Sequence, residues 1–405
     1  MPVNVYLDTQ DFSRLADAAA GRGEPDHAVV LQELLRLKAS GAADFIYSSV
    51  HLSELLQYEG GGRELTLRKA RMVKQLAGER ALMNPTRLIA WEVARVAAEL
   101  GLAPPAKSPS SPIMNGHGWH PGGFDLLFDI GSLKAARDEA LEHELRQLSA
   151  SAGAVINRKL RRRAKSEANR MRLTSLPDSA FDALVAKYPF PREIFTRTLA
   201  RYFDGKISRE EASAALLREM GDPEQFVIWY FELQTHSRDF PGWFRQAGEV
   251  LASALADLRR NLEPYAELPG AAEKYADLVS EAAVKLPRRL AQDASDEAAE
   301  FGVSSEVFAS IVEAPELLTN APFFRRLRAL LSDYIHQHSV FRQQARKPQR
   351  GDGGDLFHSL ALPYCDLWRG DAYFAGLVRT HSLPGDAEVV PRLIDLPAAI
   401  EARAL

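Results

Sequence analysis

The chain has 405 residues, of which 46% are hydrophobic and 26% charged, proportions ordinary for folded proteins that exclude a fibrous or largely disordered chain. Its length exceeds what one hydrophobic core usually serves, so we expect two folded units. Lysines and arginines number 50 against 54 acids, a net charge of −4, so affinity for nucleic acid has to come from local basic patches.

The compartment is predicted from two features of the sequence. Cys365 is the only cysteine, which excludes an intramolecular disulfide framework, and the N-terminus lacks a signal-peptide pattern. These features favour a cytoplasmic protein. No apolar run approaches the roughly 20 residues that cross a bilayer, so we expect no contact with a membrane.

The first hundred residues have the pattern of an α/β protein. Residues 3–7 form a β-prone run, followed by a polar turn and a helical pattern that extends to residue 19. Leucines recur at helical spacing over residues 29–37, and residues 45–47 resume as a strand. The predicted order is β-α-α-β, with a parallel crossover.

The pattern continues with helices. The pair Ser48-Ser49 provides cap chemistry for a helix that carries Glu54, shortly after the second strand. Two further helices are predicted over residues 65–76 and 88–100.

From residue 103 the character of the chain changes. Proline and glycine are frequent over residues 103–123, and this stretch is predicted to form neither helix nor strand. Beyond it, amphipathic helices without a fixed-period repeat are predicted over residues 133–172, 191–220, 226–231, 243–262, 271–299, 304–311 and 323–344. We therefore expect residues 103–349 to be an all-α insertion that selects a substrate or binds a protein partner.

The α/β pattern returns near the C-terminus. A glycine-rich loop precedes a helix over residues 355–362 and a short strand over residues 364–368. The predicted domains are residues 1–102 and 350–405, which together form a parallel sheet flanked by helices, and the insertion of residues 103–349 between them.

Four acidic residues follow strands or begin helices in the α/β parts: Asp8, Glu54, Asp355 and Asp371. Functional groups of parallel sheets gather at the carboxyl ends of the strands, so these acids are expected to converge. Clustered carboxylates repel one another unless a cation compensates them, and oxygen ligands suit Mg²⁺ or Mn²⁺. Such a site activates water for attack on a phosphodiester. The alternative role for Asp8, Glu54 or Asp355 is a helix cap.

These motifs resemble those of PIN domains. Val5-Tyr6-Leu7-Asp8-Thr9 is similar to the family's opening strand and turn, with Asp8 at the first metal ligand. Residues 48–55 resemble the second motif, with Glu54 at its acid, and residues 354–371 resemble the third and fourth, with Asp355 and Asp371 as ligands. The resemblance implies a metal-dependent endoribonuclease that hydrolyses RNA through Mg²⁺ or Mn²⁺.

Several neighbours of these acids are candidate accessory residues. Asp352 and Asp366 lie within a few residues of proposed ligands, and His358 shares a helix face with Asp355. For His358 the alternative is structural packing, which we favour. Asp11 is expected to be a solvent-facing turn residue.

Basic residues are the candidate contacts to nucleic acid. One group leads into the motif of Asp355, and the other lies in the densest basic run, which is alternatively a solvated helix face. They are Arg342, Arg346, Lys347 and Arg350, and Arg161, Arg162 and Arg163.

Two other functions are compatible with the same motifs. One is a non-catalytic PIN-like scaffold that binds protein or nucleic acid, and the other is a nuclease directed at DNA. Loss of activity in Asp8→Asn with binding intact would favour the enzyme over the scaffold, and a comparison of RNA with DNA would separate the two nucleases.

Overall fold

The computed structural model describes most of the chain outside its centre. The described residues are 2–56, 62–104, 110–119, 192–219, 221–233, 294–314, 316–318, 321–337, 352–380 and 382–404, with scattered positions within 131–135 and 253–292. The chain divides into two compact units, residues 1–122 with 237–405 and residues 123–236. Among the described residues, no helix has the length and apolar character that crossing a bilayer requires.

A four-stranded sheet lies at the centre of the first unit. Its order is β2-β1-β5-β6, and every neighbouring pair is parallel. Val5 of β1 pairs with Phe45 of β2 on one side and with Leu367 of β5 on the other. The predicted parallel crossover from the first strand to the second is therefore confirmed. The strands are β1 (Val3–Tyr6), β2 (Ala43–Ile46), β5 (Leu367–Trp368) and β6 (Glu388–Val389).

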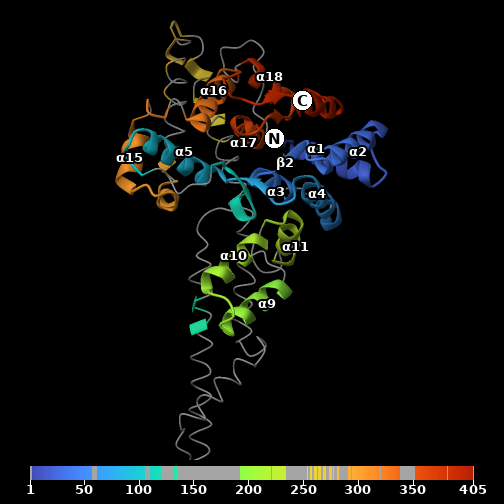
Figure 1. Cartoon of the computed structure of the whole chain (residues 1–405). Helices are drawn as coiled ribbons and strands as arrows, with labels where there is room; N and C mark the ends of the chain where they lie inside the picture. Colours follow the sequence, from blue (N-terminus) through green and yellow to red (C-terminus); the bar gives the residue numbers. More distant parts are fainter. Residues whose placement is uncertain are drawn as a thin grey trace, which may run out of the picture. The chain divides into compact units, whose positions relative to one another are not determined.

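Helices from both ends of the chain flank this sheet. In Figure 1, α17 from the C-terminal part lies beside α3 from the N-terminal part. The unit is thus a mixed α/β fold with a parallel sheet flanked by helices, as the sequence predicted. The N-terminal helices are α1 (Thr9–Ala19), α2 (Pro25–Ala39), α3 (Ser49–Leu56), α4 (Gly62–Ala77) and α5 (Pro85–Glu99). The C-terminal helices are α17 (Asp352–Ser359), α18 (Ala372–Thr380) and α19 (Leu396–Ala404).

A second, antiparallel pair of strands corrects the prediction for the proline-rich stretch. β3 (Arg80–Leu82) pairs with β4 (Ile113–Asn115), and an isolated parallel bridge joins Tyr47 to Ala81. The prediction that residues 103–123 form no strand is wrong here. Three residues free of proline and glycine, between Pro112 and Gly116, are sufficient to pair with β3.

The predicted insertion of residues 103–349 is too long. Within it, α14 (Ser295–Ala298) and α15 (Ser305–Glu313) pack on α5, and α16 (Pro322–Gln337) contacts both α5 and α18. Their apolar side chains share one buried core with α5 and α18. These helices therefore complete the core of the α/β unit, which is why the separate unit spans only residues 123–236.

The described part of the second unit is helical. It contains α9 (Arg192–Phe203), α10 (Arg209–Glu219) and α11 (Pro223–Leu233). The helix predicted over residues 191–220 is divided, because Gly205 has a positive φ of 69° and Ser208 begins a new helix. Ser208 Oγ accepts from the N–H of Glu211, whose carboxylate accepts from the N–H of Ser208, a reciprocal cap that starts α10.

Candidate metal centre

Asp8 lies at the carboxyl end of the central strand. β1 ends at Tyr6, and Asp8 has an extended backbone as the N-cap of α1. Its Oδ1 atom accepts from the N–H of Gln10 at 3.2 Å, and the residue is 7% exposed. The two roles that the sequence left open for Asp8 are compatible, because a carboxylate that caps a helix with one oxygen retains further lone pairs.

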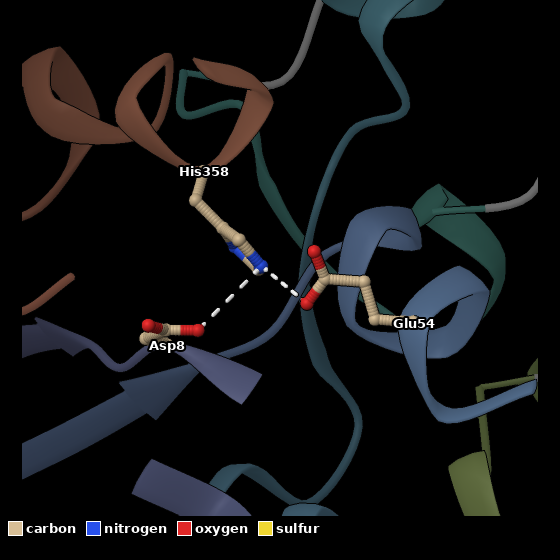
Figure 2. A group of neighbouring side chains, drawn as sticks. All are labelled: Asp8, Glu54 and His358. Atoms are coloured by element: carbon tan, nitrogen blue, oxygen red, sulfur yellow. Dashed lines mark hydrogen bonds and ion pairs between the residues drawn. The ribbon is translucent and has the colours of Figure 1, made fainter. Parts of the chain in front are cut away.

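Glu54 and His358 meet beside Asp8. Figure 2 shows His358 extending from α17 towards Asp8, which follows the strand, and Glu54, which belongs to α3. The His358 Nε2 atom lies 3.0 Å from Glu54 Oε2, 4.0 Å from Asp8 Oδ1 and 3.3 Å from Thr9 Oγ1. One ligand atom from each of Asp8, Glu54 and His358 lies within 4.8 Å of the others. His358 is 1% exposed and packs against the rings of Tyr6 and His51, in line with the packing that the sequence favoured, and its Nε2 atom also faces the acids.

The pKa values of the site residues are shifted because several carboxyl groups lie close to the imidazole of His358. Burial lowers the pKa of His358, but the carboxylates of Glu54, Asp8 and Asp355 outweigh it and raise the pKa to about 9. Burial would raise the pKa of Glu54, yet His358 holds it below its usual value. Burial raises the pKa of Asp355 to about 8, and the charges of Asp8, Glu54 and Asp371 add to that rise. In the absence of a cation, the imidazolium of His358 and the protonated carboxyl of Asp355 therefore limit the repulsion among the acids of the site.

These residues fit a divalent cation. Burial also raises the pKa of Asp8, so the protein disfavours charge on this carboxylate unless a positive charge lies close to it. Asp8, Glu54 and His358 would hold the ion, with Asp355 one helical turn before His358 on the same face of α17. The sequence predicted oxygen ligands alone, whereas the structure adds a nitrogen donor, which suits Mn²⁺ and other transition metals better than Mg²⁺.

Asp371 lies at the edge of this group. Its Oδ1 atom accepts from the N–H of Phe374 at 2.8 Å, so Asp371 caps α18. Its charge contributes to the raised pKa of Asp355, but Asp371 does not belong to the cluster of Asp8, Glu54 and His358.

The two predicted accessory aspartates have structural partners instead. Asp352 is 3% exposed, and its Oδ2 atom accepts from the hydroxyl of Tyr334 at 2.6 Å, which ties α17 to α16. The Oδ2 atom of Asp366 accepts from the N–H of Asn4 at 2.8 Å. Because Asn4 lies near the start of β1 and Asp8 follows its end, Asp366 lies at the opposite end of the strand, and its prediction as a site residue is wrong.

Asp11 is buried, so its prediction as a solvent-facing turn residue is wrong. It is 0% exposed, and its Oδ1 atom accepts from Arg369 Nη2 at 3.0 Å. Burial raises the pKa of Asp11 to about 6 although Arg369 opposes the shift. Arg369 follows β5 and also lowers the pKa of Asp8. Arg369 thus places a positive charge close to Asp8.

Sequence reasoning missed a second group of polar side chains behind His358. Tyr6, Ser48 and His51 are all buried and connect by hydrogen bonds to the far side of the His358 ring. A tyrosine within a hydrophobic strand and a histidine three residues after Ser48 were the available signals. Both residue types are common in ordinary cores, so neither signal was specific.

The predicted nucleic-acid contacts lie outside the described residues. They are Arg342, Arg346, Lys347, Arg350, Arg161, Arg162 and Arg163. No protein-family model, curated protein or solved structure matches the chain. The function is therefore inferred from the site and from the motif resemblance.

Proposed function

We propose that this protein is a metal-dependent endoribonuclease that hydrolyses RNA phosphodiester bonds with Mn²⁺ or Mg²⁺. One observation carries the proposal. Asp8, Glu54 and His358 come from three separate elements, yet their ligand atoms lie within 4.8 Å of one another at the carboxyl end of a parallel strand. Asp355 lies on the same face of α17 as His358 and adds a fourth polar group to the site.

The proposed hydrolysis follows from the cation and the proton that these side chains would hold. A divalent cation bound there would lower the pKa of a water molecule and neutralise charge on the phosphoryl oxygens. Asp8 and Glu54 would bind and orient the ion through carboxylate oxygens. In the cation-free protein, burial and the charges of Asp8, Glu54 and Asp371 raise the pKa of Asp355 to about 8, so this carboxyl group is disposed to hold a proton.

RNA is favoured over DNA by the motif resemblance to PIN domains, which the order of Asp8, Glu54, Asp355 and Asp371 along the chain supports. The acidic character of the site is compatible with either polymer, because both have the same phosphodiester charge. The test therefore compares the two directly.

The experiment uses the full chain with end-labelled single-stranded RNA and DNA of one sequence, each with Mn²⁺, Mg²⁺ or EDTA. We expect cleavage of RNA that EDTA abolishes and that Asp8→Asn lowers by about two orders of magnitude or more. Asparagine retains the helix cap, so the fold should persist. Asp26→Asn, an equal charge change at an exposed position of α2, is the matched control.

Each alternative has its own outcome. Faster cleavage of DNA than of RNA would replace the ribonuclease with a DNA-directed nuclease. A wild type that cleaves neither polymer in the presence of Mn²⁺ would favour a non-catalytic scaffold, whose acids no longer hold metal. Cleavage that persists in Asp8→Asn would show that the activity does not come from this site.

A further inference from the structure

A continuous chain of buried hydrogen bonds runs from the proposed ligand His358 back to the backbone beside Asp8. His358 Nδ1 lies 2.8 Å from the hydroxyl of Tyr6, and this hydroxyl lies 2.7 Å from Ser48 Oγ. Ser48 Oγ lies 3.2 Å from His51 Nδ1, and His51 Nε2 lies 2.6 Å from the carbonyl oxygen of Leu7.

The protons of this chain have a fixed direction at its inner end. The backbone N–H of Ser48 donates to His51 Nδ1 at 2.9 Å, so this nitrogen is an acceptor. His51 Nε2 therefore carries the ring proton and donates it to the carbonyl of Leu7.

The proton positions at His51 then determine which atom donates in each hydrogen bond towards His358. The Ser48 hydroxyl, at 3.2 Å, can share the single lone pair of His51 Nδ1 with the Ser48 N–H in a bifurcated contact. In that arrangement the Tyr6 hydroxyl donates to Ser48 Oγ, and His358 Nδ1–H donates to the Tyr6 oxygen, so every contact has one proton. The reverse direction places no proton between Ser48 Oγ and His51 Nδ1. The first arrangement leaves His358 Nε2 as the nitrogen that faces Asp8 and Glu54.

We propose that Tyr6, Ser48 and His51 are positioning residues for the metal centre, which hold the proton of His358 on Nδ1 and so direct the Nε2 lone pair at the cation. A histidine ligand generally requires such a partner for its other ring nitrogen. The inference depends on the proposed metal centre but not on RNA cleavage.

The same chain also fixes the position of Asp8. The His51 ring holds the carbonyl of Leu7, the residue immediately before Asp8, and thereby sets the backbone where β1 ends. Ring packing restrains the network further, since the His51 ring centroid lies 4.7 Å from that of His358 and 4.9 Å from that of Tyr6. Two of the three proposed ligands thus depend on His51.

The first test measures Mn²⁺ affinity by titration calorimetry in the Tyr6→Phe variant. The variant removes one hydroxyl and keeps the ring, and we expect the Kd for Mn²⁺ to rise by about 10- to 100-fold. Tyr275→Phe is the matched control, because it also removes a buried hydroxyl, one that donates to the carbonyl of Ile335 at 2.9 Å. Ser48→Ala is the second variant, which interrupts the chain at its middle.

The second test examines the ring protons of the cation-free protein. With ¹⁵N-labelled histidine at pH 7, the wild type should show a slowly exchanging Nδ1–H proton of His358, assigned by its loss in His358→Gln. In Tyr6→Phe this proton should move upfield or vanish through exchange, whereas Tyr275→Phe should leave it unchanged. A role in overall stability alone would not produce this difference.

The outcomes separate this inference from the proposed function. Mn²⁺ affinity within twofold of wild type in Tyr6→Phe or Ser48→Ala, with an unchanged Nδ1–H signal, would overturn the positioning role even if the wild type cleaves RNA. Weakened Mn²⁺ binding in these variants, with no cleavage by the wild type, would support the positioning role and reject the nuclease. A wild type that binds no Mn²⁺ would overturn both.

Discussion

Gly354 lies directly against the carboxylate of Glu54. A Cβ atom placed on Gly354 would lie 3.3 Å from Glu54 Cδ and would overlap Oε1. Only a residue without a side chain therefore lets the first turn of α17 approach α3 so closely. This approach brings Asp355 and His358, which lie on α17, to the acid from the N-terminal half of the chain.

Gly354→Ala should therefore disable the metal centre while leaving the fold intact. The added methyl group forces the carboxylate of Glu54 away from its position 3.0 Å from His358 Nε2. We expect Mn²⁺ affinity to fall by about tenfold or more, as for other changes that displace a ligand. Calorimetric titration of the variant with Mn²⁺ measures the effect.

Gly376→Ala is the matched control for this prediction. Gly376 lies within α18, and a Cβ atom there would meet nothing within 4 Å. This variant should keep its Mn²⁺ affinity and gain stability, by about 1 kcal/mol at most, from the better helix propensity of alanine. Equal Mn²⁺ affinity in both variants would show that Glu54 does not contribute to the site.

The nitrogen donor of His358 should set the preference among cations. We expect wild type to bind Mn²⁺ more tightly than Mg²⁺, and His358→Asp, an oxygen donor, to reduce that ratio by about tenfold. Titrations with both cations measure the ratio. His336→Asp, at an exposed position of α16, is the control and should leave it unchanged. The same ratio in all three proteins would exclude His358 as a ligand.

The pair of Asp11 and Arg369 should stabilise the end of the sheet. Arg369→Met removes the nearer of two arginines from the buried carboxylate of Asp11, the one at 3.0 Å, while Arg14 stays at 3.4 Å. We therefore expect the free energy of unfolding to fall by up to about 3–5 kcal/mol. The double variant Asp11→Asn/Arg369→Met should recover part of this loss in denaturant titrations. Arg392→Met, which breaks an exposed pair with Asp395, should produce no measurable loss. No recovery in the double variant would mean that Arg369 acts instead through its hydrogen bonds to the backbone carbonyls of Gly370 and Pro391.

Glu92 should give stability a dependence on pH that is separate from the metal centre. Its carboxylate accepts from the N–H of Phe323 at 3.0 Å and from the hydroxyl of Tyr364. Burial raises its pKa from 4.5 to about 7. The folded state therefore binds a proton that the unfolded state releases, so stability falls as pH rises from 4.5 to about 7, by roughly 3 kcal/mol at most.

Glu92→Gln tests this dependence because glutamine accepts the same hydrogen bonds but does not ionise. The difference in free energy of unfolding between pH 5 and pH 8 should be smaller in Glu92→Gln than in wild type, by denaturant titration. Glu99→Gln, on the same helix and 67% exposed at its side chain, should behave as wild type. Parallel pH profiles for wild type and Glu92→Gln would contradict the raised pKa.

The parts of the fold that the sequence predicted depend on local patterns. β1, α1 and α2 follow from a β-prone run, a capping aspartate and helical apolar spacing. The β-prone runs over residues 3–7 and 45–47 also placed Asp8 and Glu54 after strands. The role of His358 could not be predicted in this way, since helical spacing shows which residues share a face but not what that face meets.

Contacts between distant segments account for the other differences. α15 and α16 have the amphipathic pattern of any bundle helix, and only their packing on α5 assigns them to the α/β core. The burial of Asp11 similarly depends on Arg369, which follows a strand at the other end of the chain. Two-residue strands such as β6 carry too little local signal to be recognised.

The sheet order has a consequence for synthesis on the ribosome. β1 emerges before the other strands of its sheet, yet one of its edges is completed only by β5, and α17 emerges before that strand. Nascent or prematurely terminated chains that stop before residue 352 contain Asp8 and Glu54 but lack the imidazole that accompanies them. Such products therefore lack the proposed centre, and a growing chain cannot assemble it until α17 has been synthesised.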